Sequence, residues 1–512
     1  MKNFSTAQKI VASVLSALVI IQFSGCRSLA MLPRNEIQYA EKTHYYVHGT
    51  NSTFEVSGTT IENGIFKGLV SHPVMKPTKG QIMHLYVAPD SAIKRDGSLI
   101  SIPAVNIAKA EIYKVDAGKM ITIGAGASAA AFWTYVIILW ITKGLSCPFV
   151  YCDNGDDIRF EGEIYSGATA TPMERDDYLR LKTITPVNDR YKIRITNEVK
   201  EIQNTNLAEL FVFDHPADCE IIVDKYGQAH SVSAISKPLS ATDIYGKSLL
   251  SELSSCDNLR YLSEIRNDDL VFDTISLSFE KPLNASHARL VVSGKNTMWL
   301  DYTFGRLSDM FGNRHDEWKE RRNKRTPEEL IKWTMDQGIP LAVWVERDSG
   351  PEFVDYFNVP GPMADKKDVL MIDLAGITGN RVNIKLVSGV LFWDLDFAGM
   401  DFSSKEEFVK TMVTLEAASD EQGHDVTSRL LRDDDSYLIQ PLVNNEASLS
   451  FKAPPFAEGM ERTVYLHSKG NYEVLREAGG KPDMESLLVM LQPGRFTKFS
   501  KEHFLKYYSG PR

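Results

Sequence analysis

A run of 22 residues without a charged side chain constrains this chain more than any other part of its 512-residue sequence. The run covers residues 121–142 (ITIGAGASAAAFWTYVIILWIT) between Lys119 and Lys143. As an α-helix it would be about 33 Å long, enough to cross a hydrocarbon core of about 30 Å. Its first half is rich in Gly, Ala and Ser, as in closely packed membrane helices. We therefore expect a transmembrane helix within residues 119–145; a helix buried between soluble domains is the alternative.

The first 25 residues have the layout of a secretory signal peptide. Two lysines precede an apolar stretch, which ends in two small residues and a cysteine: Lys2, Lys9, residues 10–23, Ser24, Gly25 and Cys26. This end resembles the cleavage site of bacterial lipoproteins, in which the cysteine becomes the acylated first residue, although Phe23 stands where Leu is usual. The sequence thus predicts lipidation at Cys26, and an uncleaved anchor helix is the alternative.

These two membrane signals conflict in their topology. A lipid on Cys26 places residues 27–118 outside the cytoplasm, so one full crossing by residues 121–142 would place residues 146–512 inside it. The conflict disappears if the run does not cross fully, if Cys26 is not processed, or if the later cysteines stay reduced. The flanking lysines balance and do not decide the orientation. We favour a large body on the extracytoplasmic side, in the cell envelope.

Four cysteines remain if Cys26 carries lipid. An even number of cysteines in an exported protein suggests disulfides. We predict the pairs Cys147–Cys152 and Cys219–Cys256 from proximity in sequence, and four buried free thiols are the alternative. No second Cys or His pair follows at zinc-ligand spacing, so we expect no metal site and no cofactor.

Strand and helix signals predict a mainly β fold of several sandwich or barrel modules, with a few helices and the membrane helix. Aromatic and β-branched runs between Gly and Pro turns indicate strands at residues 44–48, 81–88 and 108–115. We divide the chain into a signal peptide, a small β domain, the hydrophobic segment, a β-rich domain, a helical segment and a β-sandwich-like C-terminal region with helices: residues 1–25, 26–118, 119–145, 146–300, 301–338 and 339–512.

Two helices are expected in the helical segment. Large apolar residues recur at helical spacing over residues 302–324. The second helix should start at Thr326, because Thr326 can cap, Pro327 fits the first turn and Glu329 completes a capping box. The basic run 319–325 (KERRNKR) suggests phosphate or lipid head groups, with an exposed helix end as the alternative.

Two strand predictions also assign faces. Residues 382–402 predict a hairpin around Ser388 and Gly389, with Trp393 on the buried face. Residues 158–165 alternate in polarity, which predicts that Ile158 and Phe160 point inward and that Glu161 and Glu163 point to solvent.

Acidic side chains gather between residues 153 and 177. The candidates for an acidic site are Asp153, Asp156, Glu161, Glu163 and Asp177. Their oxygens could bind Ca²⁺, but the spacing is not that of an EF-hand loop. A solvated acidic turn is the simpler interpretation.

Several strings after residue 145 resemble a family of uncharacterised bacterial, often Bacteroidetes-type, envelope lipoproteins. The strings are SCPFVY at 146–151, FEGE at 160–163, SGA at 166–168, ERDDY at 174–178, YKIRITNEVKE at 191–201 and FDHP at 213–216. The resemblance implies an envelope protein of unassigned activity, and it transfers no catalytic residue.

The net charge of −10 argues against a nucleic-acid partner. Two membrane signals and many strands, without a reactive constellation, favour a membrane-anchored envelope protein with a non-catalytic scaffolding or binding role. Its expected partners are membrane lipid, through Cys26 and residues 121–142, and an envelope protein or glycan. The alternative is an envelope hydrolase or glycan-binding enzyme that uses the acidic residues of the 153–177 block.

Overall fold

The structure is a computed structural model that describes residues 27–31, 44–49, 53–62, 64–70, 82–87, 92–115, 147–155, 157–404, 407–476 and 479–508. The chain forms two compact units, Met1–Ala131 and Phe132–Arg512, and each is described by itself. The predicted signal peptide, Cys26 and the run 121–142 lie outside the described residues. Within the described ranges, no helix combines the length and apolar character needed to cross a membrane.

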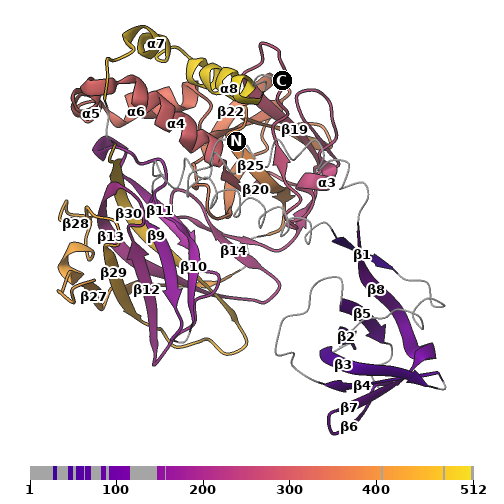
Figure 1. Cartoon of the computed structure of the whole chain (residues 1–512). Helices are drawn as coiled ribbons and strands as arrows, with labels where there is room; N and C mark the ends of the chain where they lie inside the picture. The colour runs from indigo at the N-terminus through magenta and orange to yellow at the C-terminus, as the bar shows by residue number, and fades with distance from the viewer. Residues whose placement is uncertain are drawn as a thin grey trace, which may run out of the picture. The chain divides into compact units, whose positions relative to one another are not determined.

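The first unit contains one eight-stranded sheet (Figure 1). The strand order is β1-β8-β5-β2-β3-β4-β7-β6. Among the strands that the structure describes in this unit, only β2 and β5 pair in parallel. The structure has strands at the three predicted positions, where alternate side chains such as Val47 and Leu85 are buried. The strands are β1 (Arg27–Met31), β2 (His44–His48), β3 (Thr53–Glu62), β4 (Ile65–Val70), β5 (Ile82–Val87), β6 (Lys94–Asp96), β7 (Leu99–Pro103) and β8 (Ile107–Val115).

In the second unit, two sheets pack around one apolar core and form a first sandwich. Core residues such as Val150 and Ile193 come from one sheet, and Leu210 and Leu466 come from the other. The first sheet runs β10 (Ile158–Glu163), β9 (Phe149–Asp153), β12 (Arg190–Thr196), β29 (Glu446–Lys452) and β27 (Ala417–Asp420). The second runs β11 (Arg175–Arg180), β30 (Glu461–Val474), β13 (Glu201–His215) and β26 (Val409–Thr414), and β28 (Leu438–Gln440) also pairs with β13.

Two further sheets form a second sandwich around another core. This core combines Leu290 and Leu395 of one sheet with Leu277 and Ile384 of the other. The first sheet runs β16 (Ile235–Ser236), β25 (Trp393–Asp401), β20 (His287–Asn296) and β23 (Lys366–Asp373), and β18 (Tyr261–Leu262) pairs with β25. The second runs β17 (Ser240–Thr242), β19 (Phe272–Glu280), β24 (Arg381–Gly389), β21 (Leu341–Arg347) and β22 (Gly350–Phe357).

The second sandwich is inserted into the first. All its strands lie between β13 and β26 in the sequence. The hairpin of β14 (Glu220–Val223) and β15 (Ala229–Val232) lies in the segment that leads from β13 to the second sandwich. The chain then returns to complete both sheets of the first sandwich. The sequence-based boundaries at residues 300 and 339 therefore fall inside the second sandwich, between β20 and β21.

Helices cover one end of the second unit (Figure 1). Between β20 and β21 lie α4 (Met298–Met310), α5 (His315–Arg322) and α6 (Pro327–Asp336). After β30 come α7 (Met484–Val489) and α8 (Arg495–Tyr508), whose apolar residues join the core of the second sandwich. The predicted start of α6 is confirmed, because Thr326 accepts a hydrogen bond from the Glu329 N–H and the capping box is complete.

The predicted hairpin of residues 382–402 is wrong. The strands β24 and β25 belong to opposite sheets of the second sandwich and do not pair with each other. The chain crosses from one layer to the other after Gly389. Trp393 is buried, as its pattern predicted, and its ring N–H donates to the carbonyl of Ile339 at 2.9 Å.

Candidate functional site

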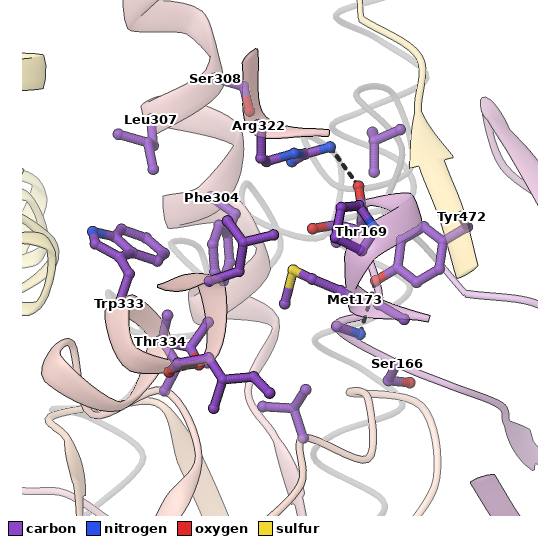
Figure 2. A pocket seen from close by; sticks show the side chains of 18 of the residues that line it. Ser166, Thr169, Met173, Phe304, Leu307, Ser308, Arg322, Trp333, Thr334 and Tyr472 are labelled. Carbon is purple, nitrogen blue, oxygen red and sulfur yellow. Dashed lines mark hydrogen bonds between the residues drawn. The ribbon is translucent and has the colours of Figure 1, made fainter. Parts of the chain in front are cut away.

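A cavity of about 710 Å³ lies between the helices and the neighbouring edge of the first sandwich. Its walls come from α4, α5, α6 and α7 on one side, and from η5 (Thr171–Met173), β11 and β30 on the other. Figure 2 shows Phe304, Leu307 and Trp333 facing Met173 and Tyr472 across this space. The volume lies within the range of about 300–1,000 Å³ that is usual for small-molecule sites.

The helical wall is apolar because the helices turn their apolar faces inward. On α4, Phe304, Leu307 and Phe311 follow three- and four-residue spacing and line the cavity. On α6, Trp333 packs against Phe304 at 6.4 Å between ring centroids and donates its ring N–H to the carbonyl of Met490 at 3.0 Å. The polar atom of the indole is thus satisfied, and its apolar surface is left to the cavity.

The opposite wall is a turn at Ser166-Gly167-Ala168. Gly167 has a φ of +85°, a conformation that favours glycine. Its N–H donates to the hydroxyl of Tyr472 at 3.0 Å, which fixes the turn to β30. Two arginines donate to carbonyls of this turn: Arg175 to Ser166 at 2.6 Å, and Arg322 to Thr169. The SGA string therefore builds a wall of the cavity.

Buried acids lie beside this turn. Asp301 of α4 lines the cavity, and burial raises its carboxyl pKa to about 7 against the opposing effect of Arg476. Burial also raises the pKa of Glu201 to about 8 and that of Glu163 well above its usual value. The thiol of Cys147 donates to Ser166 Oγ at 2.9 Å, and burial together with Glu163 raises its pKa. In each of these groups burial disfavours the charged form.

Three of the candidate acidic residues accept hydrogen bonds from backbone N–H groups. Glu161 accepts the N–H groups of Lys182 and Thr183 at 2.6 and 2.9 Å, so it anchors a loop. Glu163 accepts the N–H of Met363 at 2.8 Å. Asp177 accepts the N–H of Tyr165 at 2.7 Å.

Asp153 is separate from these three acids: it pairs with Arg194 at 2.7 Å beside a second cavity of about 590 Å³. Asp156 lies outside the described residues.

A β-bulge explains why the predicted faces of residues 158–165 are wrong. The register between β10 and β9 shifts between Phe160 and Gly162, so one extra residue enters the strand. Ile158 and Phe160 are exposed, whereas Glu161 and Glu163 are both only 5% exposed. The acids are consequently buried as structural acceptors rather than solvated.

The predicted disulfides are also wrong. None of the four described cysteines forms a disulfide: Cys147, Cys152 and Cys219 are buried, and Cys256 is exposed. Cys152 lies in β9 and Cys147 lies shortly before this strand, so five Cα–Cα steps of extended chain would separate them by about 16 Å. This is far beyond the roughly 7 Å that a disulfide can bridge. Cys219 lies 3.8 Å from His215, on the turn between β13 and β14. Within the described ranges, no group of three His, Cys, Asp or Glu side chains could hold a metal ion.

Sequence patterns do not predict most of the residues of this site. The basic run 319–325 contains Arg322, and it is the one part of the arginine cluster that a local pattern indicates. Arg175 and Arg476 reach the same cavity from β11 and from the segment after β30. Their separation along the chain left no local pattern that would join them.

Comparisons with known proteins identify no relative. No family model matches the chain, and no curated protein matches it. Among solved structures, the GH31 α-xylosidase of Xanthomonas citri aligns at 10% identity with a TM-score of 0.17, over 84% of this chain and 38% of that one. The Sulfolobus turreted icosahedral virus aligns at 8% identity and a TM-score of 0.13, over 59% of this chain and 91% of that one. A chain of the infectious bursal disease virus Gx strain aligns at 10% identity with a TM-score of 0.15, over 70% of this chain and 88% of that one. Such low TM-scores carry no argument about fold or function.

Proposed function

We propose that this protein is a membrane-anchored component of the bacterial cell envelope with a non-catalytic binding role, and that its cavity binds an apolar small molecule. The observation that supports this proposal is the cavity of about 710 Å³ with apolar walls from α4, α6 and α7. Protein interiors pack to nearly crystalline density, and an unfilled apolar space loses contacts on every wall. A space of this size is therefore better explained as a binding site than as a packing defect.

The sequence signals place this site near a membrane. If residues 121–142 form a membrane helix, only four residues lie between Thr142 and Cys147, which lines the cavity. The five Cα–Cα steps from Thr142 to Cys147 span at most about 18 Å. An apolar ligand could then pass between the bilayer and the cavity over a short path.

The enzyme alternative has less support. Glu161, Glu163 and Asp177 each accept a backbone N–H, which is a structural role. A hydrolase that uses paired carboxylates needs them to converge on a substrate. Asp153 instead faces the second cavity, in an ion pair with Arg194.

Photolabelling tests the proposed binding. The full-length chain, purified in amphipol, is incubated with a diazirine-bearing hexadecanol, irradiated, digested and mapped by mass spectrometry. We expect the label on peptides of α4 and α6. Thr334 and Ser308 are half-buried residues of the cavity wall, and replacing either with Trp should fill the space and lower labelling about tenfold, the equivalent of about 1.4 kcal/mol.

The matched control is Glu320→Trp, at an exposed position of α5 outside the cavity wall. Its labelling should equal that of the natural chain. Labelling spread evenly over the surface, and unchanged by Thr334→Trp and Ser308→Trp, would show that the cavity does not bind apolar molecules.

A further inference from the structure

We propose that the ligand of this cavity is an amphiphile, an acyl chain that ends in a carboxylate or phosphate, and that Arg322 and Arg175 bind its anionic head group. The inference rests on the proposed function and adds the chemical class of the ligand. Its evidence is the arrangement of charge around the cavity, which differs from that of an ordinary protein surface.

Arg322 is a largely buried cation without a carboxylate partner among the described residues. Its guanidinium donates to the carbonyl of Thr169 and lies 4.6 Å from the ring centroid of Trp318. Its Nε is buried and has no hydrogen-bond partner within the part of the chain that the structure describes. Burial lowers the pKa of Arg322 to about 10, against the opposing effect of Glu473. A buried cation is costly unless it is paired, so an anion in the cavity would relieve this cost.

Arg175 repeats this arrangement on the other side of the same turn. One terminal nitrogen donates to the carbonyls of Ser166 at 2.6 Å and Val359 at 3.2 Å. The other terminal nitrogen, Nη1, is buried and lacks a hydrogen-bond partner among the described residues. Arg175 and Arg322 thus flank the turn at residues 166–169, and each retains an unused N–H donor.

Arg476 adds a third positive charge to the cavity wall. Its guanidinium packs over Gly305 of α4, where a Cβ would lie 2.9 Å from Nη1 and Nη2. Burial lowers its pKa, which Asp309 and Asp301 oppose. Within the described ranges Arg476 has no ion pair, and the nearby Asp301 is held partly protonated near neutral pH. The wall therefore keeps excess positive charge.

Other basic residues of the same wall already have partners. Lys225 pairs with Asp355 at 2.5 Å, and Lys319 pairs with Glu473. Arg314 pairs with Glu317 at 2.8 Å. Arg325 also lines the wall without an ion pair in the described ranges, but its side chain is exposed to solvent. Arg175, Arg322 and Arg476 differ from it in being largely shielded from water. Guanidinium groups bind carboxylate and phosphate oxygens through paired N–H donors, which fits either head group.

The apolar wall favours an amphiphile over a free inorganic anion as the ligand. Phe304, Leu307 and Trp333 would give an inorganic anion no favourable contact, whereas an acyl chain gains about 0.8 kcal/mol for each buried CH₂. The cavity therefore combines arginines around the turn at residues 166–169 with apolar side chains of α4 and α6, and this combination matches a molecule with a charged end and an apolar body (Figure 2).

The test compares two diazirine probes of equal chain length, a hexadecanoate and a hexadecanol, on the full-length chain in amphipol. We expect the hexadecanoate to label the cavity peptides at about tenfold lower concentration, the equivalent of about 1.4 kcal/mol, because the arginines can form charge-assisted hydrogen bonds with its carboxylate. Arg322→Gln and Arg175→Gln should each reduce labelling by hexadecanoate and leave labelling by hexadecanol unchanged. Arg429→Gln, an exposed position outside the cavity wall, is the matched control. Circular dichroism confirms that each variant is folded, and Arg476→Gln replaces either variant that is not.

Each outcome separates the two proposals. Equal labelling by both probes, unchanged in the arginine variants, would overturn the anionic head group and leave apolar binding intact. Cavity labelling by neither probe would refute the proposed function itself. Competition by dodecanoate against dodecyl phosphate distinguishes the two head groups. Complete displacement of hexadecanoate by inorganic phosphate alone would overturn the amphiphile in favour of a simple anion site.

Discussion

The ammonium group of Lys366 donates a hydrogen bond to Oδ1 of Asp177 at 2.6 Å, and this ion pair joins the two sandwiches of the second unit. Asp177 belongs to β11 of the first sandwich and Lys366 to β23 of the second. Both side chains are largely buried, with 6% and 18% exposure. Burial alone would raise the pKa of Asp177, but Lys366 and Arg175 outweigh it and hold the pKa below its usual value.

Asp177→Asn should lower the free energy of unfolding by about 3 kcal/mol, because it leaves Lys366 buried without its counter-charge. Urea denaturation followed by tryptophan fluorescence measures this loss. Since the folded pKa is depressed, the contribution of Asp177 in the natural chain is present above about pH 4 and is lost as the pH falls through the folded pKa. The control is Asp157→Asn, which removes an exposed pair with Arg159 and should cost about 1 kcal/mol or less. Equal losses in both variants would contradict the structural role of the buried pair.

The buried carboxyl of Glu201 should make stability fall as the pH rises. Glu201 is fully buried, and its Oε2 has no hydrogen-bond partner within the described ranges. Burial raises its pKa to about 8, so between about pH 4.3 and 8 the folded chain keeps a proton that the unfolded chain releases. The free energy of unfolding therefore decreases across this window, by a few kcal/mol at about 1.4 kcal/mol per pKa unit.

Glu201→Gln replaces the ionisable carboxyl with an amide. It should therefore flatten much of the fall of the unfolding free energy with pH, and the variant should be more stable than the natural chain at pH 8. Part of the slope remains, because burial also raises the pKa of Glu163. Denaturation midpoints at pH 5, 6.5 and 8 measure the effect, and Glu458→Gln at an exposed position serves as the control. An unchanged slope in Glu201→Gln would show that this carboxyl is ionised in the folded chain.

Local patterns predicted the elements of this fold well. Three strands of the first unit, β2, β5 and β8, follow from runs of aromatic and β-branched residues. The capped start of α6 follows from Thr326, Pro327 and Glu329, which act over a few residues. The same local patterns did not predict which strands pair with each other. Inserting the second sandwich between β13 and β26 brings strands about 260 residues apart into one sheet, as in the pairing of Phe211 with Tyr465. No local pattern records such a partner.

The candidate site was predicted less well, for two physical reasons. The bulge between Phe160 and Gly162 interrupts the alternation of β10: residues 158–160 are exposed and residues 161–163 are buried, so Glu161 and Glu163 are buried although strict alternation exposes them. The cavity also depends on which charges lack partners. Lys319 and Arg322 share one basic run, and Glu473 of β30 lies near both, yet among the described residues only Lys319 forms an ion pair with it. The sequence could show the run but not this difference.

The cysteine thiols should differ sharply in reactivity. In a full-length Cys26→Ser variant at pH 8, a maleimide should modify Cys256 alone, because it is the exposed thiol among the four in the described ranges. Cys147, Cys152 and Cys219 should react only after denaturation, and burial further suppresses the Cys147 and Cys152 thiolates by raising their pKa. Mass spectrometry counts one adduct before and four after unfolding without reductant. Fewer than four after unfolding would indicate a disulfide.

Gly305 and Gly470 should respond in opposite directions to substitution by alanine. Gly305 lies inside α4, where alanine is favoured by about 1 kcal/mol in helix propensity. The added Cβ would approach only the terminal nitrogens of Arg476, at 2.9 Å, and this flexible side chain can move. We expect Gly305→Ala to leave the melting temperature unchanged or raise it. It should also displace the guanidinium of Arg476 and so weaken labelling of the cavity by hexadecanoate more than by hexadecanol.

Gly470→Ala is the matched contrast, because a Cβ there would lie 2.5 Å from the backbone oxygen of Asn204 and 2.7 Å from the ring of Tyr165. Neither neighbour can move without disturbing the pairing of β13 and β30, so the unfolding free energy should fall by about 1–3 kcal/mol. Calorimetry of both variants beside the natural chain measures the two effects. A large loss of stability in Gly305→Ala would show that the guanidinium of Arg476 is held rigidly over α4. In that case Arg476 would be a packing element of the helix and not a mobile part of the binding wall.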